Sequence, residues 1–190
     1  MRSDPSYRVP VILPSPRSAL LVPFVLAASV MLASTSGCTA PPEPEPTPTA
    51  LFATDEQAYA AAEEVYREYI VAVNARIAGA STPDPQDYLT GLALEADIDG
   101  VRSLEDEGVH LAGESVVTSF AGTRSSVEGG RLSVSARACL DAQNVTLIDG
   151  TGANVTPSER PAFLAQQVEF IETEDELKIS DEIAISDEQC

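Results

Sequence analysis

Residues 54–78 read TDEQAYAAAEEVYREYIVAVNARIA, a stretch that predicts one long amphipathic helix. Thr54 and Gln57 have the spacing of a capping box, in which side chains satisfy free backbone groups at a helix N-terminus. Asp55 and Glu56 place acids in the first turn, where the helix dipole favours negative charge. The apolar residues recur at helical spacing and form one stripe: Ala58, Ala62, Val65, Tyr69, Ala72 and Val73. This stripe predicts a helix that packs on the core of a domain.

Two shorter helices and a series of strands are predicted after this helix. Helical spacing places helices at residues 85–94, with Leu92 facing inward, and at 95–107, with Leu104 facing inward. β-Branched and alternating apolar residues then predict strands at 109–120, 132–140 with a continuation through 145–148, 163–171 and 177–185. Helices that precede a run of neighbouring antiparallel strands predict an α+β fold for residues 54–190.

The first 37 residues differ in composition from the rest and predict an export signal. Arg2, Arg8 and Arg17 make the beginning basic, and residues 19–33 then form an apolar run. The run spans fifteen residues, whereas a helix that crosses a membrane needs about 20. A basic region, a short apolar region and small residues in this order are typical of a secretory signal peptide, so we expect residues 1–37 to be removed.

The signal ends in the sequence LASTSGC at residues 32–38, which resembles the lipobox of bacterial lipoprotein precursors. Ser36 and Gly37 are small residues of the kind that such precursors carry directly before their cysteine, whereas Thr35 stands where an aliphatic residue is commoner. The resemblance implies that Cys38 becomes the N-terminus and carries acyl chains such as palmitate. Those chains would anchor the protein to the extracytoplasmic face of the cell membrane. The alternative is an ordinary cleaved signal with Cys38 as a free thiol.

A proline-rich stretch separates Cys38 from the predicted domain. Residues 39–50 read TAPPEPEPTPTA, a composition that cannot form a core and favours extended polyproline II at roughly 3.1 Å per residue. We therefore interpret residues 38–53 as the lipidated cysteine and a disordered linker that holds the domain away from the membrane.

The domain resembles a known architecture in the order of its parts. An amphipathic N-terminal helix, two short helices and a curved antiparallel sheet look like the NTF2-like fold, a cystatin-like α+β cone. The chain is also similar to small lipoproteins of actinobacteria, which share the spacing of Tyr66 and Tyr69, a cysteine-containing strand at 138–141, prolines within 157–161 and a C-terminal cysteine. The resemblance spans residues 54–190 and implies a cone, with no particular activity attached to it.

Two cysteines remain once Cys38 is assigned to the lipid. An even pair in an exported protein is typical of a disulfide, so we expect Cys139 and Cys190 to be bonded to each other. Two unpaired thiols or an intermolecular bond are the alternatives. A nucleophilic pair of Cys139 with His110, the single histidine of the chain, is a further alternative, although a lone histidine on a strand is usually an ordinary strand residue.

The acidic balance excludes several classes of partner. The chain has 11 Lys and Arg against 30 Asp and Glu, a net charge of −19, so nucleic acid and anionic lipid headgroups would be repelled. One histidine and three cysteines are too few for a convincing zinc site. Asp97, Asp99 and Gly100 resemble the start of a calcium loop, but Val101 and Ser103 stand where ligands are required. We therefore expect no metal and no cofactor.

The sequence favours a binding function over catalysis. We expect a membrane-anchored extracytoplasmic domain that binds a small ligand or an envelope protein in the cone or on its sheet. One alternative is an NTF2-like enzyme, which would need an Asp–His or Asp–Arg–Tyr group inside the cone. A second alternative is a structural lipoprotein of the envelope without a pocket. The candidate residues for the enzyme are the tyrosines and acids of the helical region: Tyr59, Tyr66, Tyr69, Tyr88, Asp87 and Asp97.

Overall fold

The computed structural model describes residues 52–174, 176–186 and 190. The predicted signal peptide, the lipidation site Cys38 and most of the proline-rich linker lie outside these residues. None of the helices within the described residues is long and apolar enough to cross a membrane.

The described residues form helices first and strands afterwards. In chain order the elements are α1 (Asp55–Ile77), the 3-10 helix η1 (Pro85–Tyr88), α2 (Gly91–Glu107), β1 (Val109–Ala112), β2 (Val116–Glu128), β3 (Arg131–Asp141), β4 (Thr146–Asp149), β5 (Phe163–Thr173) and β6 (Glu176–Ile185). Strands β2, β3, β5 and β6 form one antiparallel sheet in that order, and β1 and β4 form a separate antiparallel pair. The predicted α+β class is therefore confirmed.

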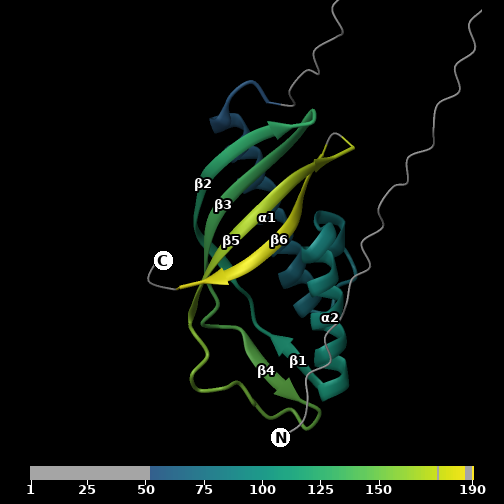
Figure 1. Ribbon diagram of the computed structural model, residues 1–190. Coiled ribbons are helices and arrows are strands. Elements are labelled where there is room, and N and C mark those ends of the chain that lie inside the picture. The colour runs from purple at the N-terminus through teal and green to yellow at the C-terminus, as the bar shows by residue number, and fades with distance from the viewer. Residues whose placement is uncertain (1–51, 175, 187–189) are drawn as a thin grey trace, which may run out of the picture. The chain divides into compact units, whose positions relative to one another are not determined.

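Both helices pack on the strands. Figure 1 shows α1 on one face of the four-stranded sheet, α2 near β6, and the β1–β4 pair beside the end of α2. The register shifts twice along the β2–β3 pair, after Val117 and after Gly122, and once between β5 and β6 after Glu169. Such bulges bend a strand and increase its twist. The sheet accordingly curves, and the arrangement is consistent with a cone-like α+β fold.

The core lies between α1 and the inner face of the sheet. The capping box is present in α1, because Thr54 Oγ1 accepts from the Gln57 backbone N–H at 3.3 Å and Gln57 Oε1 accepts from the Ala53 N–H at 3.0 Å. Alternate residues of β3 and β5 face α1, and the largest fully buried side chains are Tyr66, Phe170, Ile179, Val134, Val168 and Pro85. The side of the sheet that faces α1 is thus filled by side chains.

The predicted helix at 95–107 lies within α2 and ends at Glu107 as expected, but the predicted helix at 85–94 is wrong, because η1 ends at Tyr88. Leu89 has extended backbone angles and bridges to Ile179 of β6, and the Thr90 N–H donates to the Ile179 carbonyl at 2.8 Å. Pairing with the edge strand β6 therefore prevents Leu89 and Thr90 from adopting a helical conformation. One helix, α2, follows from Gly91, and Leu92 in its first turn is 61% exposed rather than inward.

Two of the predicted strands also differ from the structure. The strand expected at 109–120 breaks at Gly113, which has φ +94° and lies so close to the Asn144 carbonyl that a Cβ would be 1.9 Å from its oxygen. Its second part, β2, runs on to Glu128. Residues 145–148 do not continue β3 but give rise to β4, which pairs with β1. A glycine-dependent turn therefore separates the small β1–β4 pair from the main sheet.

The predicted cysteine pair is present. Cys139 lies on β3 with Cys190 at disulfide distance, and the two Cα atoms are 5.7 Å apart. Neighbouring β3 residues such as Ala138 and Leu140 belong to the core cluster with α1, whereas Cys139 alternates to the opposite face. The bond therefore fixes the last residue of the chain to the outer face of the sheet.

Candidate functional site

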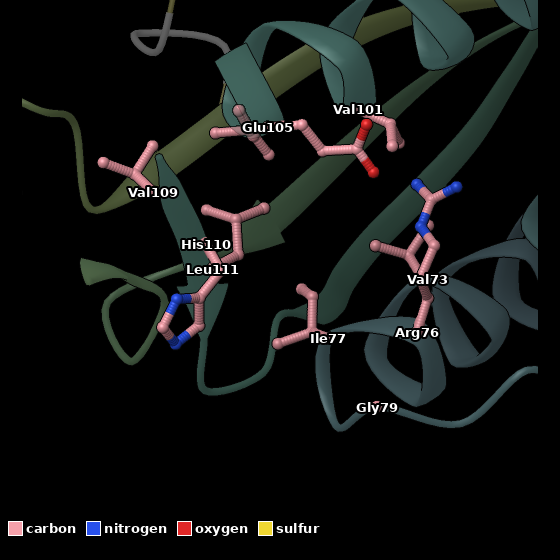
Figure 2. Close-up of a pocket in the computed structure, with 10 residues that line it drawn as sticks. Val73, Arg76, Ile77, Gly79, Val101, Glu105, Val109, His110 and Leu111 are labelled. Carbon is pink, nitrogen blue, oxygen red and sulfur yellow. The ribbon is translucent and has the colours of Figure 1, made fainter. Parts of the chain in front are cut away.

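A largely apolar pocket of about 420 Å³ lies where the C-terminal halves of α1 and α2 meet β1. Figure 2 shows side chains from all three elements around it. Its apolar wall consists of Val73, Ile77, Val101, Leu104, Val109 and Leu111. The size is within the range of pockets that hold small organic ligands.

The local folding of each element explains why these side chains meet. Val73 and Ile77 are four residues apart on α1, and Val101 and Leu104 are three apart on α2, so each pair shares a helix face. Gly108 ends α2 in a left-handed conformation with φ 68°, and β1 starts at the next residue. The last turn of α2 and the strand β1 therefore form adjacent walls, and the predicted inward position Leu104 lines the pocket.

Polar groups lie at the border of this apolar wall. Arg76, Glu105 and His110 line the pocket together with the apolar residues. Figure 2 shows the Arg76 guanidinium and the Glu105 carboxylate on the same side of the pocket, near Val101. These groups are able to interact with a polar end of a bound molecule.

Arg76 is held in place by Asp97. Its Nη1 and Nη2 donate to the two carboxylate oxygens of Asp97 at 2.9 and 2.5 Å, and Gln86 Nε2 donates to Asp97 Oδ2 at 3.2 Å. Burial alone would raise the pKa of Asp97, but the hydrogen bonds from Arg76 and Gln86 and the Arg76 charge outweigh it and lower that pKa. The hydrogen bond to Asp97 raises the pKa of Arg76. The pair is therefore ionised.

The other side of Asp97 faces a smaller pocket between α1, α2 and β6. This pocket has a volume of about 210 Å³ and is lined by Tyr69, Ala93, Ala96, Asp97 and Glu182. A neighbouring buried residue, Tyr66, donates a hydrogen bond from its hydroxyl to Glu182 Oε1 at 2.7 Å. We call Tyr66, Tyr69, Asp97 and Glu182 the polar cluster.

Burial controls the ionisation of this cluster. Burial raises the pKa of Tyr66 and of Tyr69, and the nearby Glu182 carboxylate adds to both shifts. Burial also raises the pKa of Glu182, and the hydrogen bond from Tyr66 offsets only part of that effect. Both phenols are therefore neutral hydrogen-bonding groups at physiological pH.

The structure brings together only part of the predicted tyrosine and acid set. Tyr66, Tyr69 and Asp97 belong to the polar cluster. Tyr59 instead packs over Gly122 of β2, where a Cβ would lie 2.2 Å from the ring. Asp87 is exposed, and its backbone carbonyl accepts a hydrogen bond from Lys178 at 2.8 Å.

The remaining candidates for catalysis are placed apart. Tyr88 is half-buried at the end of η1 and does not line the 210 Å³ pocket. His110 pairs with Ile148 in the β1–β4 ribbon, whereas Cys139 lies in the main sheet with Cys190. The structure therefore does not form the Cys139–His110 pair. Within the described residues, no group of three or more His, Cys, Asp or Glu side chains is arranged to hold a metal ion.

Sequence reasoning missed Glu182, the residue that completes the polar cluster. Ile179 lies opposite Phe170 and faces the core, so strict alternation would place residues 181 and 183 inward. The bulge between β5 and β6 shifts this phase, so that Glu182 lies opposite the buried Val168 instead. Nothing in the local sequence marks the bulge, so alternation alone could not have found Glu182.

Comparisons with known proteins give no family for this chain. No protein-family model and no curated protein matches it. Among solved structures, the intermembrane space region of the chloroplast protein ARC6 is similar with a TM-score of 0.47 and 14% identity, covering 67% of this chain and 96% of that chain. The protein Aln2 from a Streptomyces species is similar with a TM-score of 0.41 and 14% identity, covering 72% of this chain and 95% of that chain.

Proposed function

We propose that this chain is a membrane-anchored extracytoplasmic lipoprotein whose NTF2-like α+β domain binds a small, mostly apolar ligand without chemically changing it. The 420 Å³ pocket between α1, α2 and β1 is the binding site. The observation that carries this proposal is the pocket's largely apolar lining from three elements, together with the ion-paired Arg76.

The sequence supports the location. Residues 32–38 resemble a lipobox, and a proline-rich stretch lies between Cys38 and the domain. The pairing of Cys139 with Cys190 agrees with an oxidising compartment, because disulfides rarely persist in the cytosol. With Cys38 lipidated, the domain would stand outside the membrane and bind ligands there.

The state of Asp97 argues against this carboxylate as a general base. Asp97 is engaged by Arg76 and Gln86, and its lowered pKa makes it a weak base. Tyr66 donates its proton to a hydrogen bond with Glu182. A general base needs a pKa near the operating pH and access to substrate, and Asp97 does not meet the first condition.

A pocket-filling variant tests ligand binding. The probe is the apolar dye N-phenyl-1-naphthylamine, whose fluorescence rises when it leaves water. We expect Val101→Trp to fill the pocket and to weaken dye binding at least about tenfold, because the indole occupies the volume that the dye needs. Leu92→Trp adds the same group to an exposed position of α2 and should leave binding unchanged. Equal binding by both variants would contradict the assigned pocket.

Fractionation tests the anchor. The Cys38→Ala variant should move from the membrane to the soluble fraction, because no acyl chain can be attached to alanine. Cys139→Ala and Cys190→Ala together serve as the control and should stay with the membrane. Membrane association that is unchanged in Cys38→Ala would show that the lipid assignment is wrong.

A further inference from the structure

The 210 Å³ pocket beside the polar cluster carries a second assignment that is independent of the apolar pocket and of the lipid anchor. Its lining is polar where the larger pocket is apolar: Tyr69, Asp97 and Glu182 face it, together with the small side chains of Ala93 and Ala96. Three elements, α1, α2 and β6, contribute these groups.

Tyr69 has a hydroxyl group without a hydrogen-bond partner. The residue is only 9% exposed, and within the described residues its hydroxyl takes part in no hydrogen bond. Its electrostatic interactions are with Glu182, Asp97 and Arg76, which places the hydroxyl beside the pocket. The hydroxyl oxygen itself is not fully buried, so it can be reached from the pocket. The unpaired hydroxyl is therefore available to a ligand in the pocket.

The charges around the pocket define what kind of ligand fits. Arg76 neutralises Asp97 through two hydrogen bonds, so this pair has no net charge. Glu182 has no cation of its own: one carboxylate oxygen accepts from the neutral Tyr66, and within the described residues no basic group pairs with it. Glu182 is only partly exposed, and a carboxylate shielded from water without a counter-ion is unfavourable. A ligand with one positive charge would balance it.

The number of acceptors matches one cation in particular. An alkylammonium group has three N–H donors and no acceptor. Glu182, Asp97 and Tyr69 each offer an oxygen acceptor to the same pocket. We propose that the pocket lined by Tyr69, Asp97 and Glu182 binds the primary ammonium group of a small organic amine. A volume of about 210 Å³ admits the ammonium and a few carbon atoms.

Methyl NMR on alanine-labelled full chain tests this assignment, because Ala93 and Ala96 lie in the pocket wall. The probe is propylammonium, and its neutral match is propanol. We expect propylammonium to shift both methyl signals in a saturable way. Potassium and tetramethylammonium, which lack N–H donors, should produce no such shift. Equal shifts with propanol and propylammonium, or no shift with propylammonium, would overturn the proposal.

Four variants test whether these side chains bind propylammonium. Glu182→Gln keeps the acceptor for Tyr66 and removes the charge, so propylammonium should bind at least about tenfold more weakly. Tyr69→Phe should weaken binding about fivefold, because one neutral hydrogen bond is lost. Asp181→Asn removes a charge next to Glu182 but outside the pocket, and Tyr59→Phe removes a phenol elsewhere on α1; both should bind as the parent does. Binding that falls equally in all four variants would overturn the proposal, because it would reflect general charge and folding.

A second pair of probes distinguishes two possible sources of the primary ammonium group, a free amine and a lipid headgroup. Ethanolamine represents a free amine, and glycerophosphoethanolamine represents a lipid headgroup. The limited volume favours ethanolamine, and binding of ethanolamine alone or of both supports an ammonium site. If neither ethanolamine nor glycerophosphoethanolamine shifts the alanine methyl signals while propylammonium does, the assignment to small polar amines is overturned.

Discussion

Arg76 on α1 and Asp97 on α2 form a bidentate ion pair, with N–O distances of 2.5 and 2.9 Å. The pair joins the two helices and lies between the two pockets, because Arg76 lines the larger pocket and Asp97 lines the smaller one. The Asp97 side chain is 7% exposed and that of Arg76 is 33% exposed, so the pair is shielded from much of the solvent. Such a pair contributes more to helix packing than a surface pair, because removal of one partner leaves a buried charge.

Loss of this pair should destabilise the domain measurably. We expect Asp97→Asn to lower the free energy of unfolding by about 2 kcal/mol, since Arg76 loses a charged partner. Asp99→Asn is the matched control on the same helix: Asp99 pairs with Arg102, but both side chains are largely exposed, so the change should stay within about 0.5 kcal/mol. Urea unfolding of the parent and both variants measures the difference. Equal effects would refute the stabilising role of the Arg76–Asp97 pair.

Gly122 should be required for the contact between β2 and α1. A Cβ at this position would lie 2.2 Å from the Tyr59 ring, so we expect Gly122→Ala to lower the free energy of unfolding by about 1–3 kcal/mol. The loss should shrink in a Tyr59→Ala background, where the ring is absent. Gly100→Ala is the control, because it adds a methyl to α2 with nothing within 4 Å and should stabilise by about 0.5–1 kcal/mol. Thermal and urea unfolding distinguish these outcomes.

Glu182 should make the domain relatively less stable as the pH rises. Its pKa in the folded state is raised above the ordinary 4.5, so its favourable contribution is complete below that value and is lost as the pH rises through the folded pKa. Glu182→Gln removes this dependence. The difference in unfolding free energy, variant minus parent, should therefore increase from pH 4 to pH 7.

The groups that face Glu182 do not disturb this comparison. Tyr66 and Tyr69 stay neutral in this range because their pKa values are raised. The pKa of Asp97 is lowered by Arg76 and Gln86, so its stabilising contribution changes with pH in the opposite direction. That contribution is present above the ordinary pKa and is lost as the pH falls. Because Asp97 is present in both proteins, its effect cancels in the difference. Parallel stability curves for parent and variant would contradict a raised pKa of Glu182 in the folded state.

The bond between Cys139 and Cys190 should contribute strongly to stability. The two residues are 51 positions apart, and a loop of that length gives a stabilisation of about 4 kcal/mol in the chain-entropy model. We expect the double serine variant to lose up to about this amount in urea unfolding. Cys38→Ser should leave the unfolding free energy unchanged. Thiol labelling of the unreduced domain should find neither Cys139 nor Cys190, and labelling of either would contradict the bond.

Helix α1 and the cysteine pair could both be predicted from the sequence. The capping residues Thr54 and Gln57 and the apolar stripe predict α1 almost to its ends, because both signals lie within the helix itself. The pairing of Cys139 with Cys190 followed from an even number of remaining cysteines. The helix prediction needed only signals within the helix, and the disulfide prediction needed only the number of cysteines.

Predictions failed where a distant segment decides the local structure. The helix expected from residue 85 is interrupted because the Thr90 N–H bonds to Ile179, which lies about ninety residues further along the chain. Glu182 was missed because a bulge against β5 reverses which residues of β6 face α1. In both cases the decisive contact is made by the edge strand β6 with a segment distant in sequence or on the neighbouring strand, and no pattern within the mispredicted segment indicates that contact.

The Cys139–Cys190 bond also changes what a protease can do to this domain. It closes the chain from the middle of β3 to the last residue into a ring that contains β4, β5 and β6. Residues 150–155 form an exposed stretch within that ring, where cleavage is most readily expected. A single cut there would release no fragment, because both products stay joined through the sulfurs and β5 stays paired between β3 and β6. A nicked molecule would therefore keep its sheet.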